Sequence, residues 1–513
     1  MDAEKAPSVF DVVDPAFSSA AEKDLLSSSP SPPLGWLERL TRFLRTWGVE
    51  THGIEPVPQI ARTDTRTYQL FFLWFSTNLS VLTVSTGVSG PAFFSLGQRD
   101  AFLIILVVDL LYVPAPAPDA VFGPQLGMRA MVQSRFSWGY YAAALPAALN
   151  VFSLQGFLIL DTIIGGQTLA AVSPSRLNAT AGIVIIAVLS LVLTFCGYRV
   201  LHWYEQFAWV PNAVAFITLL AVGARDMRTA PAPSAPPTAS AVLSFASIVC
   251  ISVFSWCTMS PDYGVHHAPA PPRRVILFVY LGFLLGSLPG HMIGAALASA
   301  APVVPDWAAG LGPDSSDVGG LVGAVLARAG GFGRFLTALI ALTIPSGVAP
   351  TMYSFGTSLM AVTPLAARVP RYVWGVVATA VLIPVGIVGA VRFYNTFVDI
   401  LSVIGYWSAP FAGIVLADHF VIRRGRWASY EPADWDRPRV LPLGAAAFGA
   451  WLFSVGIIVP CMNQVYYVGP IAAAGAGDIA IYTSVVLAVI MYIPARLLEM
   501  RFERRIGQGG AVH

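Results

Sequence analysis

Long apolar runs dominate this chain and restrict what it can fold into. A helix needs about 20 consecutive apolar residues to cross a hydrocarbon core of about 30 Å. Runs of about this length occur at 70–94, 101–118, 138–166, 181–197, 207–224, 241–260, 275–300, 332–357, 373–390, 396–417, 441–462 and 478–497. The sequence therefore predicts an all-α integral membrane protein of about twelve transmembrane helices.

The composition agrees with lipid as the solvent of this chain. Of 513 residues, 56% are hydrophobic and 11% are charged, whereas a soluble domain carries about 25% charged residues. The basic residues are dispersed and the net charge is only +2, which does not favour a nucleic-acid partner.

The four cysteines, Cys196, Cys250, Cys257 and Cys461, lie in or beside apolar runs without paired spacing. We predict that they pack in the core and form neither disulfides nor metal sites.

The distribution of arginine predicts the orientation. With both termini inside, 16 arginines fall on inside loops and segments and 7 on outside ones, which follows the positive-inside rule. Residues 1–66 are rich in Ser, Pro, Ala and charge, without the apolar segment of a signal peptide; we predict a disordered cytosolic tail there. The sequon at Asn178 falls outside in this orientation and is read either as a helix cap or as a glycosylation site.

Two spans at matching positions carry polar and glycine-rich interruptions. The first span contains STNLSVLTVSTGVSGP at 76–91, and the sixth ends in SVFSWCTMSPDYG at 252–264. Transporters built from inverted repeats often place the substrate near the bilayer midplane between two such broken helices. Spans one and six are five apart, which predicts two repeats of five helices. The alternative is that the small residues only allow close helix packing.

Several motifs resemble a known family. The stretches GIEPVP at 53–58, RTD at 62–64 and WFSTN at 74–78 resemble the start of the first span in the fungal purine-cytosine permeases of the nucleobase–cation symporter family. Further matches follow in order at 97–101, 122–129, 133–137, 165–167, 197–202 and 256–263, so the resemblance covers residues 53–420.

This resemblance implies a LeuT-like fold, with a 5+5 inverted repeat followed by two C-terminal helices. It also implies a plasma-membrane importer of cytosine, adenine, hypoxanthine or guanine that works by alternating access and is coupled to a proton. The domains would be a cytosolic tail, two five-helix repeats, two additional helices and a cytosolic C-terminal tail. Their boundaries would be 1–66, 67–224, 241–420, 441–497 and 498–513.

Asp161 is the most informative single position. It lies inside the third span, where an ionisable side chain costs at least about 3 kcal/mol. The resemblance places an asparagine that contacts the base at this position in related permeases. An acid here would accept the coupled proton, or accept hydrogen bonds from a ring N–H and an exocyclic amine. The alternative is an aspartate satisfied by neighbouring hydroxyls near the outer end of the helix.

Hydroxyl and aromatic side chains on the broken spans are further candidates for the substrate site. The resemblance favours Thr83, where related permeases carry a serine, with Ser80 as its neighbour; the alternative is that these hydroxyls bond to their own helix. On the sixth span, Trp256 or Phe254 would stack on a flat heterocycle, which contributes about 1–3 kcal/mol. The alternative for Trp256 is an anchor at the membrane interface.

The eighth span departs from the family pattern, which has two asparagines, one residue and a proline ahead of Tyr-Ser. Pro350, Tyr353 and Ser354 match that pattern, whereas Gly347 and Val348 occupy the asparagine positions. Each unmatched buried polar group costs about 1–3 kcal/mol, so the loss of two amides predicts a changed ligand preference. A cationic or differently substituted heterocycle becomes an alternative to cytosine.

The sequence motifs do not favour an enzymatic or metal-binding function. The membrane half of the chain has no HExxH, GxSxG, Walker loop or metal-spaced histidine cluster, so no enzyme, cofactor or metal site is predicted. The His266-His267 pair lies in a Pro-rich loop and is expected to be solvated. A same-fold transporter of a vitamin, ureide or nucleoside and a non-transporting nutrient sensor both stay open. The sequence does not specify the preferred base, the proton stoichiometry or the oligomeric state.

The coupling ion follows from the resemblance. Sodium would need oxygen ligands on spans one and eight, and the corresponding positions on span eight, Ala338, Ala341 and Leu342, offer no side-chain oxygen. Thr343 is the only nearby hydroxyl. The proton is therefore the expected driving ion.

Overall fold

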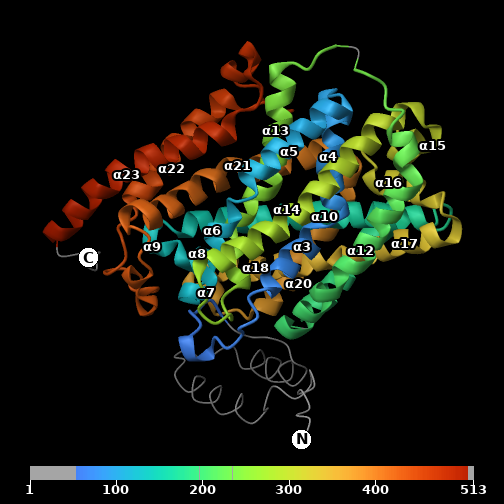
Figure 1. Ribbon diagram of the computed structural model, residues 1–513. Coiled ribbons are helices and arrows are strands. Elements are labelled where there is room, and N and C mark those ends of the chain that lie inside the picture. Colours follow the sequence, from blue (N-terminus) through green and yellow to red (C-terminus); the bar gives the residue numbers. More distant parts are fainter. Residues whose placement is uncertain (1–52, 196, 234, 507–513) are drawn as a thin grey trace, which may run out of the picture. The chain divides into compact units, whose positions relative to one another are not determined.

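The computed structural model describes residues 53–195, 197–233 and 235–506 (Figure 1). The predicted disorder of residues 1–52 lies outside the described residues, as do residues 507–513 of the predicted C-terminal tail, whereas residues 498–506 belong to the last helix. The described chain is built of helices, and its only β-pairing is two isolated bridges, Asp64 with His267 and Asn463 with Val468. The all-α fold predicted from the sequence is confirmed.

In the described part of the first half, the 3₁₀ turn η2 (Gln59–Ala61) is followed by ten α-helices. They are α3 (Gln69–Asn78), α4 (Val81–Phe94), α5 (Gln98–Tyr112), α6 (Pro116–Ala120), α7 (Phe122–Leu126), α8 (Ala130–Gln133), α9 (Arg135–Trp138), α10 (Ala144–Val172), α11 (Ala179–Phe195) and α12 (Gly197–Met227).

The second half begins with α13 (Ala239–Phe254) and the 3₁₀ turns η3 (Ser255–Thr258) and η4 (Ser260–Tyr263). It continues with α14 (Pro272–Ala300), η5 (Ala301–Val303), α15 (Pro305–Leu311), α16 (Val318–Ala327), α17 (Gly330–Thr343), α18 (Pro345–Val362), α19 (Pro364–Ala367), α20 (Arg371–Ala390) and α21 (Phe393–Ala417). After the π-helical turn η6 (Asp418–Ile422), the chain ends with α22 (Ala445–Cys461) and α23 (Ala480–Ile506).

The membrane spans agree with the sequence-based count. Among the described residues, nine helices are long and apolar enough to cross a membrane, and α3 with α4 forms a tenth span bent by 48°. The two remaining predicted spans are the shorter apolar helices Ala179–Phe195 and Ala445–Cys461. Each has 17 residues, and a crossing helix needs at least about 17.

The two halves repeat the same order of elements. Each begins with a broken span, α3 with α4 in the first and α13 with η3 and η4 in the second. In each, short helices precede the third span: α8 and α9 come before α10, and α15 and α16 come before α17 with α18. Both helix breaks were expected from the polar and glycine-rich residues of spans one and six.

A row of glycines brings α14 against the broken first span. A Cβ at Gly286 would lie 2.9 Å from the Phe75 carbonyl oxygen, and one at Gly290 or Gly294 would overlap α4 itself, at Thr83 and at the Val84 carbonyl. Glycines four residues apart lie on one face of a helix, and their missing side chains let two backbones approach closely. The backbone of α14 therefore supports the first span on both sides of its break.

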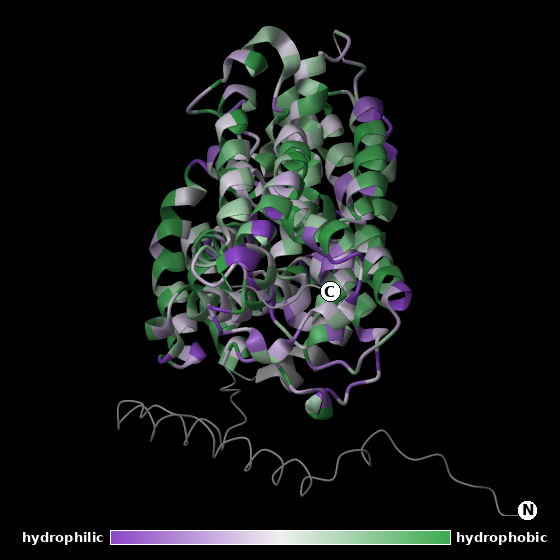
Figure 2. Cartoon of the chain, turned by 90° about the vertical axis from the view of Figure 1, so that its left-hand side faces the viewer, coloured by the Kyte–Doolittle hydropathy of each residue, from purple (hydrophilic) through white to green (hydrophobic). Residues whose placement is uncertain are grey.

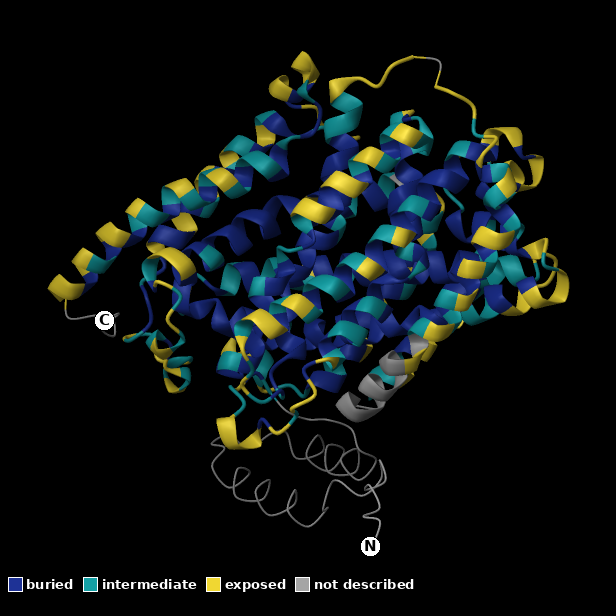
Figure 3. Cartoon of the chain, in the orientation of Figure 1, coloured by how far each residue is buried: buried dark blue, intermediate teal, exposed yellow. Residues whose placement is uncertain are grey.

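Apolar side chains cover the outside of the bundle. Phe152, Leu111 and Val388 are 75%, 67% and 74% exposed, and hydrophobic residues (green) extend over the helix surfaces (Figure 2). The buried residues lie within the bundle and the exposed ones on outer helix faces and in loops (Figure 3). Such a surface suits lipid and would be an aggregation liability in water.

Several local expectations can now be compared with the structure. The Asn178 side chain accepts a hydrogen bond from the Ala181 backbone N–H at 2.8 Å, which is the capping alternative. The three cysteines within the described chain, Cys250, Cys257 and Cys461, are buried and unbridged. The expectation that His267 is solvated is wrong: it is buried, because the segment around Asp64 pairs with the loop that carries it.

Candidate functional site

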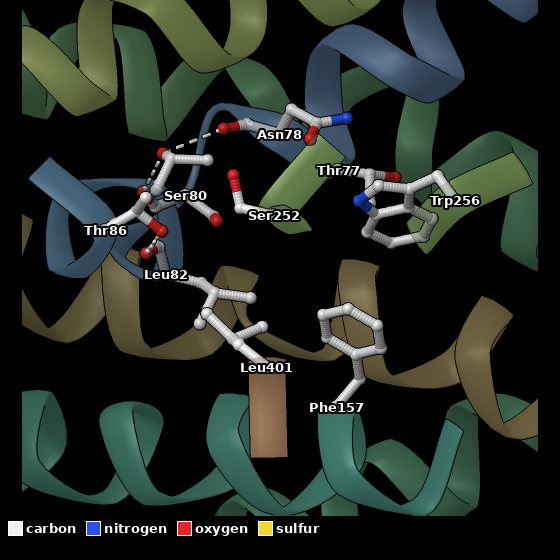
Figure 4. A pocket seen from close by; sticks show the side chains of 10 residues that line it. Thr77, Asn78, Ser80, Leu82, Thr86, Phe157, Ser252, Trp256 and Leu401 are labelled. Carbon is white, nitrogen blue, oxygen red and sulfur yellow. Dashed lines mark hydrogen bonds between the residues drawn. The ribbon is translucent and has the colours of Figure 1, made fainter. Parts of the chain in front are cut away.

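A small cavity lies beside the break between α3 and α4 (Figure 4). It is lined by Thr77, Asn78, Ser80, Leu82, Thr83, Thr86, Phe157, Ser252, Trp256 and Leu401, which come from α3, α4, α10, α13, η3 and α21. Its volume of about 20 Å³ suits roughly one water molecule. A drug-sized ligand needs a pocket of at least about 300 Å³, so a heterocycle fits only when the surrounding helices move apart.

The backbone oxygens freed by the helix break are bonded by side chains. Thr83 Oγ1 lies 2.9 Å from the Asn78 carbonyl oxygen and 2.7 Å from that of Ser80. Asn212 Nδ2 on α12 donates to the Leu79 carbonyl oxygen at 2.7 Å, and Asn212 Oδ1 accepts from the Thr343 hydroxyl at 2.6 Å. Thr83 thus lines the cavity, as the first interpretation of the sequence has it. Its hydroxyl also bonds to nearby backbone oxygens, as the alternative interpretation has it.

Stacked aromatic rings form one wall of the cavity. Trp256 on η3 and Phe157 on α10 have ring centroids 5.8 Å apart and an interplanar angle of 26°. Trp74 on α3 meets Trp256 edge-on at 5.4 Å. Phe157 was not identified from the sequence, although it lies one helical turn before Asp161 on the same face of α10.

Asp161 is buried in α10 and faces α18. Its side chain is 7% exposed, and no hydrogen bond or ion pair to another described residue is present. A Cβ at Gly347 would lie 3.6 Å from Asp161 Oδ2, so the two positions singled out in the third and eighth spans face each other. A buried carboxylate in this position can accept hydrogen bonds from a ligand or take up a proton.

The structure gathers some of the sequence-selected residues at the cavity but not all of them. Ser80, Thr83 and Trp256 line it, whereas Phe254 is buried outside its wall. Val348 is completely buried and Pro350 lies inside helix α18; neither lines the cavity. The role of each in binding stays a prediction.

Polar contacts join three elements near one end of the bundle. The Arg129 guanidinium donates to the Tyr353 hydroxyl at 2.6 Å. Asp262 on η4 accepts hydrogen bonds from the Ala130 backbone N–H at 2.8 Å and from the Ser354 hydroxyl at 2.9 Å. These contacts connect α8, η4 and α18, and no sequence pattern predicts these pairings.

Several known sequences are similar to this chain over most of its length. The family described as permease for cytosine/purines, uracil, thiamine, allantoin matches residues 56–434. Purine-cytosine permease fcyB of Emericella nidulans is 33% identical over 90% of this chain and 91% of its own length. Purine-cytosine permease FCY21 of Saccharomyces cerevisiae is 32% identical over 91% of this chain and 89% of its own. Vitamin B6 transporter TPN1 of Saccharomyces cerevisiae is 24% identical over 90% of this chain and 89% of its own.

Solved structures give the same fold. Mhp1, a nucleobase-cation-symport-1 family transporter solved with bromovinylhydantoin bound, superposes with a TM-score of 0.64 at 16% identity, covering 88% of this chain and 96% of that one. A Na⁺-coupled sialic acid symporter superposes with a TM-score of 0.56 at 16% identity, covering 84% and 89%. The predicted LeuT-like arrangement, two inverted five-helix repeats with two further helices, is therefore confirmed.

Proposed function

This chain belongs to the family of permeases for cytosine, purines, uracil, thiamine and allantoin, and we propose that it imports a purine or pyrimidine base together with a proton by alternating access. The family description supports transport of a small nucleobase-like substrate and not catalysis as the proposed activity. The bases proposed are cytosine, adenine, hypoxanthine and guanine. The proposed location is the plasma membrane, with both termini in the cytosol.

The cavity beside the helix break is the observation that carries this proposal. A flat base would stack against Trp256 and Phe157, whose rings already lie nearly parallel at 5.8 Å, and each stacked base contributes about 1–3 kcal/mol. Ser80 lies on the opposite part of the cavity wall (Figure 4), and Thr83 also lines the cavity. Widening of the cavity would bring Asp161, one turn along α10 from Phe157, within reach of the base edge.

Asp161 is the proposed proton acceptor next to the substrate. Its carboxylate has no counter-charge among the described residues, so a proton would remove an uncompensated buried charge. Sodium is a less suitable partner, because Thr83 and Asn212 already bond the carbonyl oxygens at the helix break. Loading of both base and proton would leave the closed site without net charge.

A differently substituted heterocycle is the second candidate substrate, and the facing positions Asp161 and Gly347 favour it. An amide at 347 would lie against the Asp161 carboxylate, whereas glycine leaves that space to the ligand. A cationic or donor-rich ring would then pair with Asp161. The relative named as a vitamin B6 transporter gives a reason to include such rings.

Uptake in permease-deficient cells tests both candidates. Radiolabelled cytosine, adenine, hypoxanthine, guanine and pyridoxine are supplied with and without a protonophore, to wild type, Asp161→Asn and Gly347→Asn. The proposal expects protonophore-sensitive uptake of at least one base and a preference shifted by about 10-fold or more in either variant. A surface-expressed wild type that moves none of the bases would refute the base assignment, and pyridoxine uptake would then support the second candidate. Binding without flux would identify a sensor.

A further inference from the structure

A second ionisable site lies away from the cavity, where α14 packs against α5. His291 Nδ1 lies 3.0 Å from Asp109 Oδ2, and both side chains are 0% exposed. At 1.5 Å per residue, Asp109 lies about 16 Å from the start of α5 and His291 about 14 Å from the end of α14. The pair is therefore near mid-span, where ionisable residues are costly and characteristically mark substrate or ion pathways.

Each member of this pair keeps one polar atom without a hydrogen-bond partner in the described part of the chain. These atoms are Asp109 Oδ1 and His291 Nε2. When Nδ1–H donates to Asp109, Nε2 carries a lone pair that can accept another proton. The pair thus has one internal hydrogen bond and one open position for a proton.

Other titratable groups near the pair are few. Cys250 on α13 interacts electrostatically with Asp109, and Tyr112 on α5 and Tyr482 on α23 interact in turn with Cys250. Asp119 lies on α6, which also packs against α14. The broken span, residues 69–94, contributes no charged residue. A proton at His291 would therefore be balanced chiefly by Asp109.

Helix α14 connects this pair directly to the cavity. Ser287, one turn before His291, donates to Asn78 Oδ1 at 3.3 Å, and Asn78 lines the cavity. Gly290 lies against Thr83, and a Cβ at Gly87 on α4 would overlap the His291 carbonyl. Any change in how α5 holds α14 is thus transmitted to both sides of the helix break.

We propose that Asp109 and His291 form a second proton-binding site of the transport cycle, which rests on the proposed function of proton-coupled import. A proton from the outer solution binds His291 Nε2, so the imidazolium and the Asp109 carboxylate together carry no net charge. Release of that proton to the cytosol restores neutral imidazole and leaves one negative charge. Because imidazolium and carboxylate attract each other as opposite charges in the low-dielectric interior, whereas neutral imidazole only donates a hydrogen bond to the carboxylate, the loaded pair holds α14 to α5 more firmly than the unloaded pair does.

The test separates coupling from folding by measuring two fluxes in proteoliposomes. Counterflow exchanges labelled for unlabelled base without a pH gradient, whereas accumulation requires the gradient. Asp109→Asn and His291→Gln can both keep a hydrogen bond between the helices. Asp109→Asn removes the negative charge that balances a proton on His291, and His291→Gln removes the group that binds the proton. We expect counterflow within about 2-fold of wild type and a loss of pH-driven accumulation of about 10-fold or more, because each variant removes a charge-changing step. His419→Gln, which alters a buried histidine bonded to Tyr430, is the matched control.

The exchanged variant Asp109→His with His291→Asp is the second test, since it restores both partners. It should regain accumulation if the singles lose it or fail to fold. Full accumulation in either single variant would overturn the proposal while leaving proton-coupled import intact, and so would an exchanged variant that counterflows without accumulating. A wild type that accumulates no base with the gradient would instead refute the proposed function on which this site depends.

Discussion

Two carboxylates are buried in this molecule and face different surroundings. Asp161 on α10 has no ion-pair partner among the described residues and faces Gly347, whereas Asp109 on α5 is paired with His291. A buried group without a partner is costly unless a ligand or proton satisfies it. In our proposals, Asp161 therefore binds the substrate and a proton beside it, and the pair binds a second proton that changes how α14 is held to α5.

The largest effect should come from removing the unpaired carboxylate. Asp161→Ala should lower both counterflow and accumulation by about 100-fold or more, since a site that loses a charged hydrogen-bonding partner discriminates strongly against its ligand. The control is Asp306→Ala, which changes an exposed aspartate in the first turn of α15. If counterflow survives in Asp161→Ala while accumulation fails, the two carboxylates have the same role and the contrast between them is lost.

A smaller effect is expected where α14 joins the two regions. Gly290→Ala would place a methyl group on Thr83, and overpacking of this kind costs about 1–3 kcal/mol. Uptake should fall by about 10-fold with surface expression retained, as measured by flux and surface labelling. Gly449→Ala in α22, with no atom within 4 Å of its Cβ, is the matched control and should transport normally. Equal losses in both variants would mean that the contact between α14 and α4 has no special part in transport.

The smallest effect concerns the aromatic wall. Trp256→Leu removes the stacking surface while keeping an apolar side chain, and should raise the half-saturating base concentration by about 10-fold, since stacking contributes about 1–3 kcal/mol. Phe254→Leu, two residues away and outside the cavity wall, should change it by less than about 2-fold. If Phe254→Leu raised the half-saturating base concentration more than Trp256→Leu does, Phe254 and not Trp256 would be the stacking residue.

Much of the fold could be predicted because lipid imposes a length and a polarity on every crossing segment. The broken spans could also be predicted, since glycine, serine and threonine interrupt the apolar runs at residues 76–91 and 252–264. His291 was missed because a single histidine in an apolar run gives no partner by itself. Its pairing with Asp109 joins residues 182 positions apart, which only the packing of α5 against α14 brings together.

The site was predictable in part for the same reason. Asp161 stood out because a charge within a span is expensive, and its position opposite Gly347 follows from how α10 packs on α18. Phe157 looked like an ordinary lipid-facing or core residue among many apolar neighbours. The contacts of Asn212 with Leu79 and Thr343 join three segments that lie far apart in the sequence, so no local sequence pattern predicts them.

Recording the pH inside proteoliposomes that contain the purified full-length protein tests the central claim most directly. An inward gradient of the transported base, applied without an initial pH gradient and with the membrane potential clamped, should acidify the lumen. That acidification should be abolished by a protonophore and unchanged when sodium is replaced by potassium. Entry of labelled base without any acidification, or acidification that depends on sodium, would contradict proton-coupled import.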